Sequence, residues 1–149
     1  MPLSQLRISH LRCIRDLHLA PVRGINWLVG ANGQGKTSVL EGISMLGTGA
    51  SFRGGDSLTT LGQQQTIVFG ALSDPDGKIG VMREGGQRNI RLDGETLSSA
   101  WPLLEALPTL AIIPENQQSL RDPPQARRRM LDWGLFHVEP GYGDMLREY

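Results

Sequence analysis

The chain has 149 residues, of which 39% are hydrophobic and 20% are charged. This composition is typical of one globular domain, and no apolar run approaches the ~18–20 residues that a transmembrane helix needs. Fifteen basic and fifteen acidic residues cancel, so any contact with nucleic acid must come from a local patch. The single cysteine, Cys13, cannot form an internal disulfide, and we expect a cytoplasmic protein in which Cys13 packs as a small apolar residue.

Two short strands are predicted at the beginning of the chain. Apolar and polar residues alternate from Leu3 to Ser9, and the alternation returns less regularly from Ile14 to Leu19. The bend between them carries Arg12, which we consider a candidate nucleotide contact. An exposed turn arginine is the alternative interpretation.

A phosphate-binding loop follows, because the chain matches the pattern G-x-x-x-x-G-K-[ST]. The apolar run from Ile25 to Val29 predicts a buried strand before the loop, and residues 38–46 predict a helix after it. A plain glycine-rich connection is the alternative. The candidate phosphate-binding residues are Gly30, Ala31, Asn32, Gly33, Gln34, Gly35, Lys36, Thr37 and Ser38.

The residue types in this loop suit a polyphosphate. Glycines let backbone N–H groups turn towards an anion, and the helix that begins near Lys36 directs its positive dipole end to the same place. The Lys36 ammonium can reach the β- and γ-phosphates, and the Thr37 hydroxyl is a natural Mg²⁺ ligand. We therefore predict ATP and Mg²⁺ as cofactors.

An antiparallel region is predicted next. The glycine-rich stretch from Gly47 to Asp56 is expected to be a mobile loop. Three strands should follow, at Gln65 to Leu72, Lys78 to Arg83 and Gln87 to Leu92, with tight turns between them. The fold class expected is α/β, with a mixed sheet and an antiparallel portion beside a nucleotide-binding core.

A helix from Leu97 to Leu107, capped by Ser98 or Ser99, and a buried strand from Thr109 to Ile113 complete this part. Polar side chains at the carboxyl end of such a strand can face a ligand. The residues after this strand, which could therefore face Mg²⁺ or an attacking water, are Glu115, Asn116 and Gln117. A solvated turn is an alternative of equal weight.

The last predicted helix begins at Asp122 and runs to about His137. Its three adjacent arginines, Arg127, Arg128 and Arg129, are candidate DNA contacts. A solvated or ion-paired face is the other interpretation, since Arg128 and Asp132 are spaced for an i,i+4 pair.

Several sequence runs together resemble the amino-terminal part of the RecF family, bacterial recombination-mediator ATPases whose head is similar to ABC transporters and chromosome-maintenance proteins. The resemblance covers essentially all 149 residues. It rests on residues 8–12, 28–41, 51–53, 91–94, 113–115 and 127–134.

The resemblance implies a P-loop ATPase head of the ABC type that binds DNA in an ATP-dependent way, at gapped or double-stranded sites. It also implies help in loading recombinase at single-strand gaps, within recombinational repair, DNA replication and the SOS response. ATP-dependent homodimerisation and recombination-mediator partner proteins would accompany this activity. In the family Arg12 would lie near the nucleotide, and residues 115–117 would lie near the Gln loop. Asn commonly follows this arginine in the family, whereas Cys13 follows here.

The family's coiled-coil lobe, signature motif and Walker B carboxylates would all lie beyond the equivalent of Tyr149, so we interpret residues 1–149 as an incomplete head. The full-length relative would be a slow, DNA-stimulated ATPase, and this fragment is expected to lack hydrolysis. A nucleotide- or partner-binding module without turnover is the alternative function. A small-molecule P-loop kinase is disfavoured by the antiparallel stretch and by the lack of an arginine-rich lid.

Overall fold

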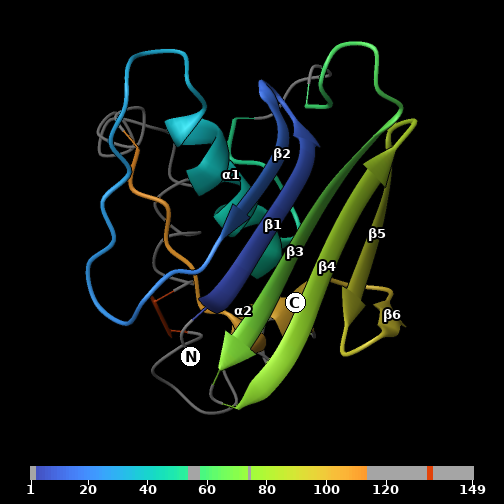
Figure 1. The fold of residues 1–149 in the computed structure, drawn as a ribbon. Coiled ribbons are helices and arrows are strands. Elements are labelled where there is room, and N and C mark those ends of the chain that lie inside the picture. The colour runs from blue at the N-terminus through green and yellow to red at the C-terminus, as the bar shows by residue number, and fades with distance from the viewer. Residues whose placement is uncertain (1–2, 54–57, 74, 114–133, 136–149) are drawn as a thin grey trace. The chain divides into compact units, whose positions relative to one another are not determined.

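The computed structural model describes residues 3–53, 58–73, 75–113 and 134–135. The chain divides into two units, Met1–Ala111 and Ile112–Tyr149, and every element described below belongs to the first. That unit combines a six-stranded sheet with two helices (Figure 1). Neither of these helices has the length and apolar character needed to cross a membrane.

The sheet contains β1 (Leu3–Leu11), β2 (Ile14–Leu19), β3 (Gln65–Ser73), β4 (Asp76–Glu84), β5 (Gln87–Leu92) and β6 (Glu95–Leu97). Its strand order is β2-β1-β3-β4-β5-β6, and every pairing among these strands is antiparallel. The first five strands confirm those expected from hydrophobic alternation, with shifts of at most two residues at their ends. The predicted mixed sheet is present among the described residues only in its antiparallel portion.

Alternation in the strands directs one set of side chains to the same face of the sheet. Leu6 and Ile8 of β1 are fully buried, and Ile8 lies opposite the buried Val68 of β3. Val68 in turn lies opposite Val81 of β4, which is also buried. This row forms the hydrophobic core beneath helix α1.

Helix α1 (Lys36–Thr48) packs on β1, β3 and β4, and helix α2 (Trp101–Ala106) contacts α1. The helix approaches the sheet closely at Gly42, where an added Cβ would lie 2.6 Å from Ile8 Cδ1. Met45 and Leu46 are fully buried one turn further along. Close packing therefore fixes α1, and with it the loop that precedes it.

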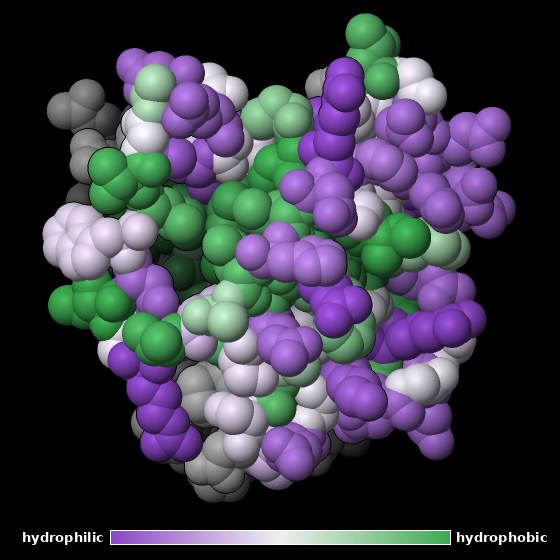
Figure 2. Space-filling view, viewed as in Figure 1, coloured by the Kyte–Doolittle hydropathy of each residue, from purple (hydrophilic) through white to green (hydrophobic). Residues whose placement is uncertain are grey.

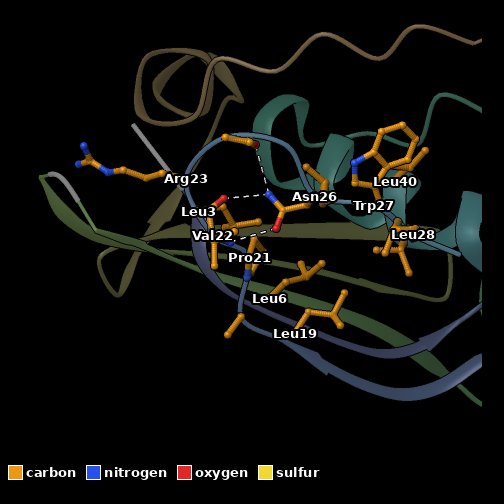
Figure 3. Close-up of a pocket in the computed structure, with 14 residues that line it drawn as sticks. Leu3, Leu6, Leu19, Pro21, Val22, Arg23, Asn26, Trp27, Leu28 and Leu40 are labelled. Carbon is orange, nitrogen blue, oxygen red and sulfur yellow. Dashed lines mark hydrogen bonds between the residues drawn. The ribbon is translucent and has the colours of Figure 1, made fainter.

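The segment between β2 and α1 differs from the prediction, because Ile25 to Val29 forms no strand. Its Asn26 side chain closes a local loop by accepting from Val22 N at 3.0 Å and donating to Val22 O at 2.8 Å. Apolar side chains gather around a hollow at the left of Figure 2, where Figure 1 places this segment. Figure 3 shows the Asn26 bonds and the residues that line the hollow.

Five further predictions need correction. Residues 109–113 form no strand, and Leu97 ends β6 instead of beginning a helix. Helix α2 begins at Trp101 after Ala100 and has no side-chain cap bond, so neither predicted serine caps it. Residues 47 and 48 of the expected loop belong to α1, and Cys13 is exposed rather than packed. The helix predicted from Asp122 lies outside the described residues, except for 134 and 135, which are helical.

Candidate functional site

The phosphate loop turns sharply into α1 through two glycines. Gly33 has a φ of 81° and Gly35 a φ of 92°, a left-handed region that glycine adopts without steric cost. Gly35 is the N-cap of α1, no side chain caps the helix, and its first turn contains no acidic residue. The unpaired N–H groups and positive dipole end of α1 are therefore left to an anion rather than to a protein side chain.

The turn between β1 and β2 lies against this loop. A Cβ added at Gly35 would lie 3.1 Å from Ile14 Cγ1 and 3.2 Å from Cys13 Sγ. Arg12, next in the same turn, has a φ of 55°, and its backbone N–H donates to Leu58 O at 2.8 Å. A larger residue at position 35 would push the loop away from Cys13 and Ile14, so the absence of a side chain at Gly35 lets the turn and the loop pack closely.

Lys36 is bonded within its own loop in this structure. Its Nζ donates to the carbonyl oxygens of Gly30 and Ala31, both at 2.8 Å. The Gln34 side chain closes the other side, because its Oε1 accepts from Ala31 N at 3.1 Å. A bound phosphate would have to replace carbonyl oxygens as the partner of Lys36.

A cavity of about 390 Å³ opens at the amino end of α1. Seven of the predicted residues line it, whereas Gly30, Ala31 and Gln34 of the loop do not. Thr37 is exposed, so its hydroxyl is accessible from this cavity. Within the described ranges, no cluster of three His, Cys, Asp or Glu side chains could hold a metal ion. The lining residues are Arg12, Cys13, Asn32, Gly33, Gly35, Lys36, Thr37, Ser38 and Arg53.

Behind the cavity lies a buried carboxylate, Glu41 of α1, which has no exposed surface. Arg12 Nη2 donates to Glu41 Oε1 at 2.9 Å, and Arg12 Nε lies 3.3 Å from both carboxylate oxygens. Arg53 donates to Glu41 Oε2 from Nε at 2.9 Å and also from Nη2, and its Nη2 donates to Ser38 Oγ at 3.0 Å. The Ser51 hydroxyl donates to Glu41 Oε1. One carboxylate thus joins two arginines to the helix that follows the phosphate loop.

The charge state of Glu41 follows from these contacts. Burial by itself would raise the pKa of its carboxyl group, because desolvation disfavours the charged form. Hydrogen bonds from Arg12, Ser51 and Arg53, together with the charge of Arg53, outweigh burial and lower the pKa below the usual range for glutamate. Glu41 is therefore ionised at neutral pH, as two guanidinium partners require.

Sequence reasoning missed Glu41 and gave no role to Arg53, although a signal for Glu41 was present. Glu41 lies three residues after Ser38 and four before Met45, on the stripe of α1 that is buried. A charged residue on such a stripe is almost always paired. Arg53 follows a glycine-rich stretch, where no hydrophobic periodicity indicates which way its side chain points. The candidate residues 115–117 and 127–129 lie outside the described residues.

The chain is similar in sequence to known proteins. The family model of the AAA domain matches residues 5–95, which include the phosphate loop, Glu41 and Arg53. The chain belongs to the AAA domain family. Two curated relatives, both DNA replication and repair protein RecF, are each 40% identical over 95% of the chain. One is from Pseudomonas fluorescens (strain SBW25) and the other from Shewanella oneidensis.

Solved structures extend the likeness to the fold. The recombination mediator protein RecF-ATP in the RecFOR pathway has a TM-score of 0.78 and 27% identity, over 89% of this chain and 37% of that chain. The SMC head domain from Thermotoga maritima, with a TM-score of 0.53 over 71% of this chain and 42% of that chain, is 16% identical and shows the fold alone. The predicted resemblance to the amino-terminal part of RecF is confirmed, as is the fold class of an incomplete P-loop ATPase head. This AAA domain chain spans about 40% of the length of the curated relatives that it matches.

Proposed function

We propose that the chain is the ATP-binding amino-terminal part of a RecF-like DNA replication and repair protein. The observation that carries this proposal is the cavity at the amino end of α1, where uncapped helix N–H groups meet Lys36, Arg12 and Arg53. Three cationic side chains and a positive helix end in one cavity match a polyphosphate better than a neutral ligand. The likeness to RecF-ATP supports ATP as that polyphosphate.

Each group in the cavity has a distinct proposed role. Backbone N–H groups at Gly33 and Gly35 and the start of α1 bind phosphate oxygens, while Lys36 exchanges its two carbonyl partners for the terminal phosphates. Thr37 is the residue that would hold Mg²⁺, through its exposed hydroxyl group. Bound Mg²⁺ would neutralise part of the negative charge of the phosphates. Mg²⁺ as a cofactor and the contribution of residues 115–117 remain parts of this proposal.

The activity of the whole protein is also proposed by analogy with the relatives. ATP-dependent DNA binding, recombinase loading at gaps, recombination-mediator partners, homodimerisation and a cytoplasmic location would accompany a RecF-like role, and slow ATP hydrolysis would require segments beyond residues 1–149. Arg127, Arg128 and Arg129 stay candidate DNA contacts. A second candidate function, nucleotide or partner binding without turnover, is favoured for the chain as given because it spans only about 40% of those relatives.

Calorimetry of the 149-residue chain with Mg·ATP tests the binding proposal. Lys36→Ala should abolish detectable binding, because it removes the ammonium that reaches the phosphates, and steady-state hydrolysis should stay at background in both proteins. The chain has one other lysine, Lys78 of β4, which is exposed and lies outside the cavity lining. Lys78→Ala is thus the matched control and should bind like the unaltered chain. Equal affinity of Lys36→Ala and Lys78→Ala would refute the proposal.

Cys13 provides an independent readout of the same cavity. It is the only cysteine of the chain, is exposed, and lines the cavity beside Gly35. A bound nucleotide should therefore slow the alkylation of Cys13 by a thiol reagent several-fold, measured by mass spectrometry over time. The protection should disappear in Lys36→Ala and persist in Lys78→Ala. Alkylation that ATP leaves unchanged in every variant would place the nucleotide elsewhere.

A further inference from the structure

Glu41 has no place in the roles above, because it does not line the phosphate cavity and has no exposed surface. Such a residue cannot touch the ligand, yet it is fully charged and lies directly behind two residues that do line the cavity. Burying a carboxylate is costly unless it is paired and hydrogen-bonded, and Glu41 is both. Its arrangement therefore needs an explanation beyond core packing.

Glu41 bonds to side chains from two separate parts of the chain. Arg12 comes from the β1–β2 turn and Arg53 from the stretch after α1, and each uses its Nε and Nη2 against the carboxylate. Two-point contacts of this kind fix the plane of a guanidinium as well as its position. The Arg12 side chain is accordingly only 16% exposed. Both guanidinium groups are held in this way, and both arginines line the cavity.

Holding these side chains in advance should matter for binding. A free arginine has many rotamers, and ordering it when a ligand arrives reduces affinity. An arginine that Glu41 already orders loses little freedom at that moment. The carboxylate engages Nε and Nη2 of each guanidinium, so both groups are ordered before a ligand binds.

We propose that Glu41 is a positioning residue for nucleotide binding, which orders Arg12 and Arg53 at the wall of the phosphate cavity. This inference rests on the proposed function, since it concerns the same cavity. Positioning and simple charge balance predict opposite changes in ATP affinity when Glu41 is neutralised. If Glu41 only reduced the positive charge of the cavity, its neutralisation would strengthen ATP binding, whereas loss of positioning weakens it.

The test is a mutant cycle on the 149-residue chain, with Mg·ATP affinity measured by calorimetry and folding by circular dichroism. The four proteins are the unaltered chain, Glu41→Gln, the double variant Arg12→Ala/Arg53→Ala, and the triple variant that combines all three changes. Glu41→Gln should weaken ATP binding about tenfold, which corresponds to losing the order of one or two long side chains. It should cause no further loss in the double variant, because no arginine remains to be positioned.

Controls keep the outcomes distinct. Glu84→Gln alters an exposed glutamate of β4 and should leave affinity unchanged. Glu41→Asp keeps the charge but shortens the reach by one methylene, and it replaces Glu41→Gln in the cycle if the latter does not fold, with the same loss expected. Tighter or unchanged ATP binding by the Glu41 variant, or an equal loss in both backgrounds, would overturn the inference while the unaltered chain still bound ATP. No binding by the unaltered chain would instead overturn the proposed function, and this inference with it.

Discussion

The two flanks of the phosphate loop are built in opposite ways. On the downstream flank, α1 packs on the sheet with Met45 and Leu46 fully buried, and Glu41 bonds to arginines on either side of it in sequence. On the upstream flank, residues 20–29 form no strand, and Trp27 and Val29 are 83% and 89% exposed. The phosphate loop thus joins a helix that is packed and hydrogen-bonded to a segment that is largely exposed.

The upstream flank also borders a second cavity, of about 580 Å³ (Figure 3). This cavity is lined by Trp27 and by leucines of β1, β2 and α1. The polar side chain of Asn26, which also lines it, is hydrogen-bonded to the backbone of Val22. Leu40 of α1 also borders it and is 51% exposed. An apolar composition and actual burial are therefore separate properties of a segment. The downstream flank has both, while the upstream flank has the composition alone.

The largest expected difference is between two leucines of the same helix. Leu46→Ala should lower the free energy of unfolding by about 3 kcal/mol, because it leaves a cavity in a filled core. Leu40→Ala should cost less than about 1 kcal/mol, since half of its side chain already meets solvent or open space. Urea unfolding followed by circular dichroism measures both. Equal losses would show that the two faces of α1 are equally covered, and the comparison would fail.

An intermediate effect is expected from pH. The pKa of Glu41 is lower in the folded chain than in the unfolded one, so its contribution is present above the ordinary glutamate pKa of about 4.3 and is lost as pH falls through the lowered folded value. Glu41→Gln should therefore be about 1–3 kcal/mol less stable than the unaltered chain at pH 7, and this gap should shrink on acidification. Arg12 and Arg53 face Glu41, from the β1–β2 turn and from after α1.

Urea titrations at pH 7, 5, 4 and 3 measure this gap. The upstream flank supplies an internal contrast, because residues 20–35 contain no Asp or Glu and cannot contribute such a dependence. Glu84→Gln, an exposed change in β4, is the control at pH 7 and should leave the free energy of unfolding unchanged there. A gap that stayed constant down to pH 3 would mean that the Glu41 carboxylate contributes no charge-dependent stability.

The smallest expected effect concerns Trp27. Trp27→Ser should change the free energy of unfolding by less than about 0.5 kcal/mol, because Trp27 is 83% exposed. The same change should reduce binding of a hydrophobic fluorescent dye, since it removes a large part of an exposed apolar patch. Dye fluorescence at fixed protein concentration, beside the urea midpoint, checks both. A loss above 1 kcal/mol would place Trp27 in a packed environment.

Local patterns explain what could be predicted from the sequence. Alternation located β1 to β5 because each strand buries one face, and the loop motif located the start of α1 because its chemistry fixes residue types at fixed spacing. The run from Ile25 to Val29 misled because a strand exists only with a partner, and pairing is not local. The Glu41 cluster was missed for a similar reason, since its partners lie 29 and 12 residues away along the chain.

Lys36 of α1 donates two hydrogen bonds back to the start of its own loop, at Gly30 O and Ala31 O. The Lys36 ammonium joins the first two residues of the loop to the start of α1 through these bonds. Binding is then an exchange of partners, in which two carbonyl contacts are given up as phosphate contacts form. The net gain in free energy on phosphate binding is therefore the difference between the two sets of contacts.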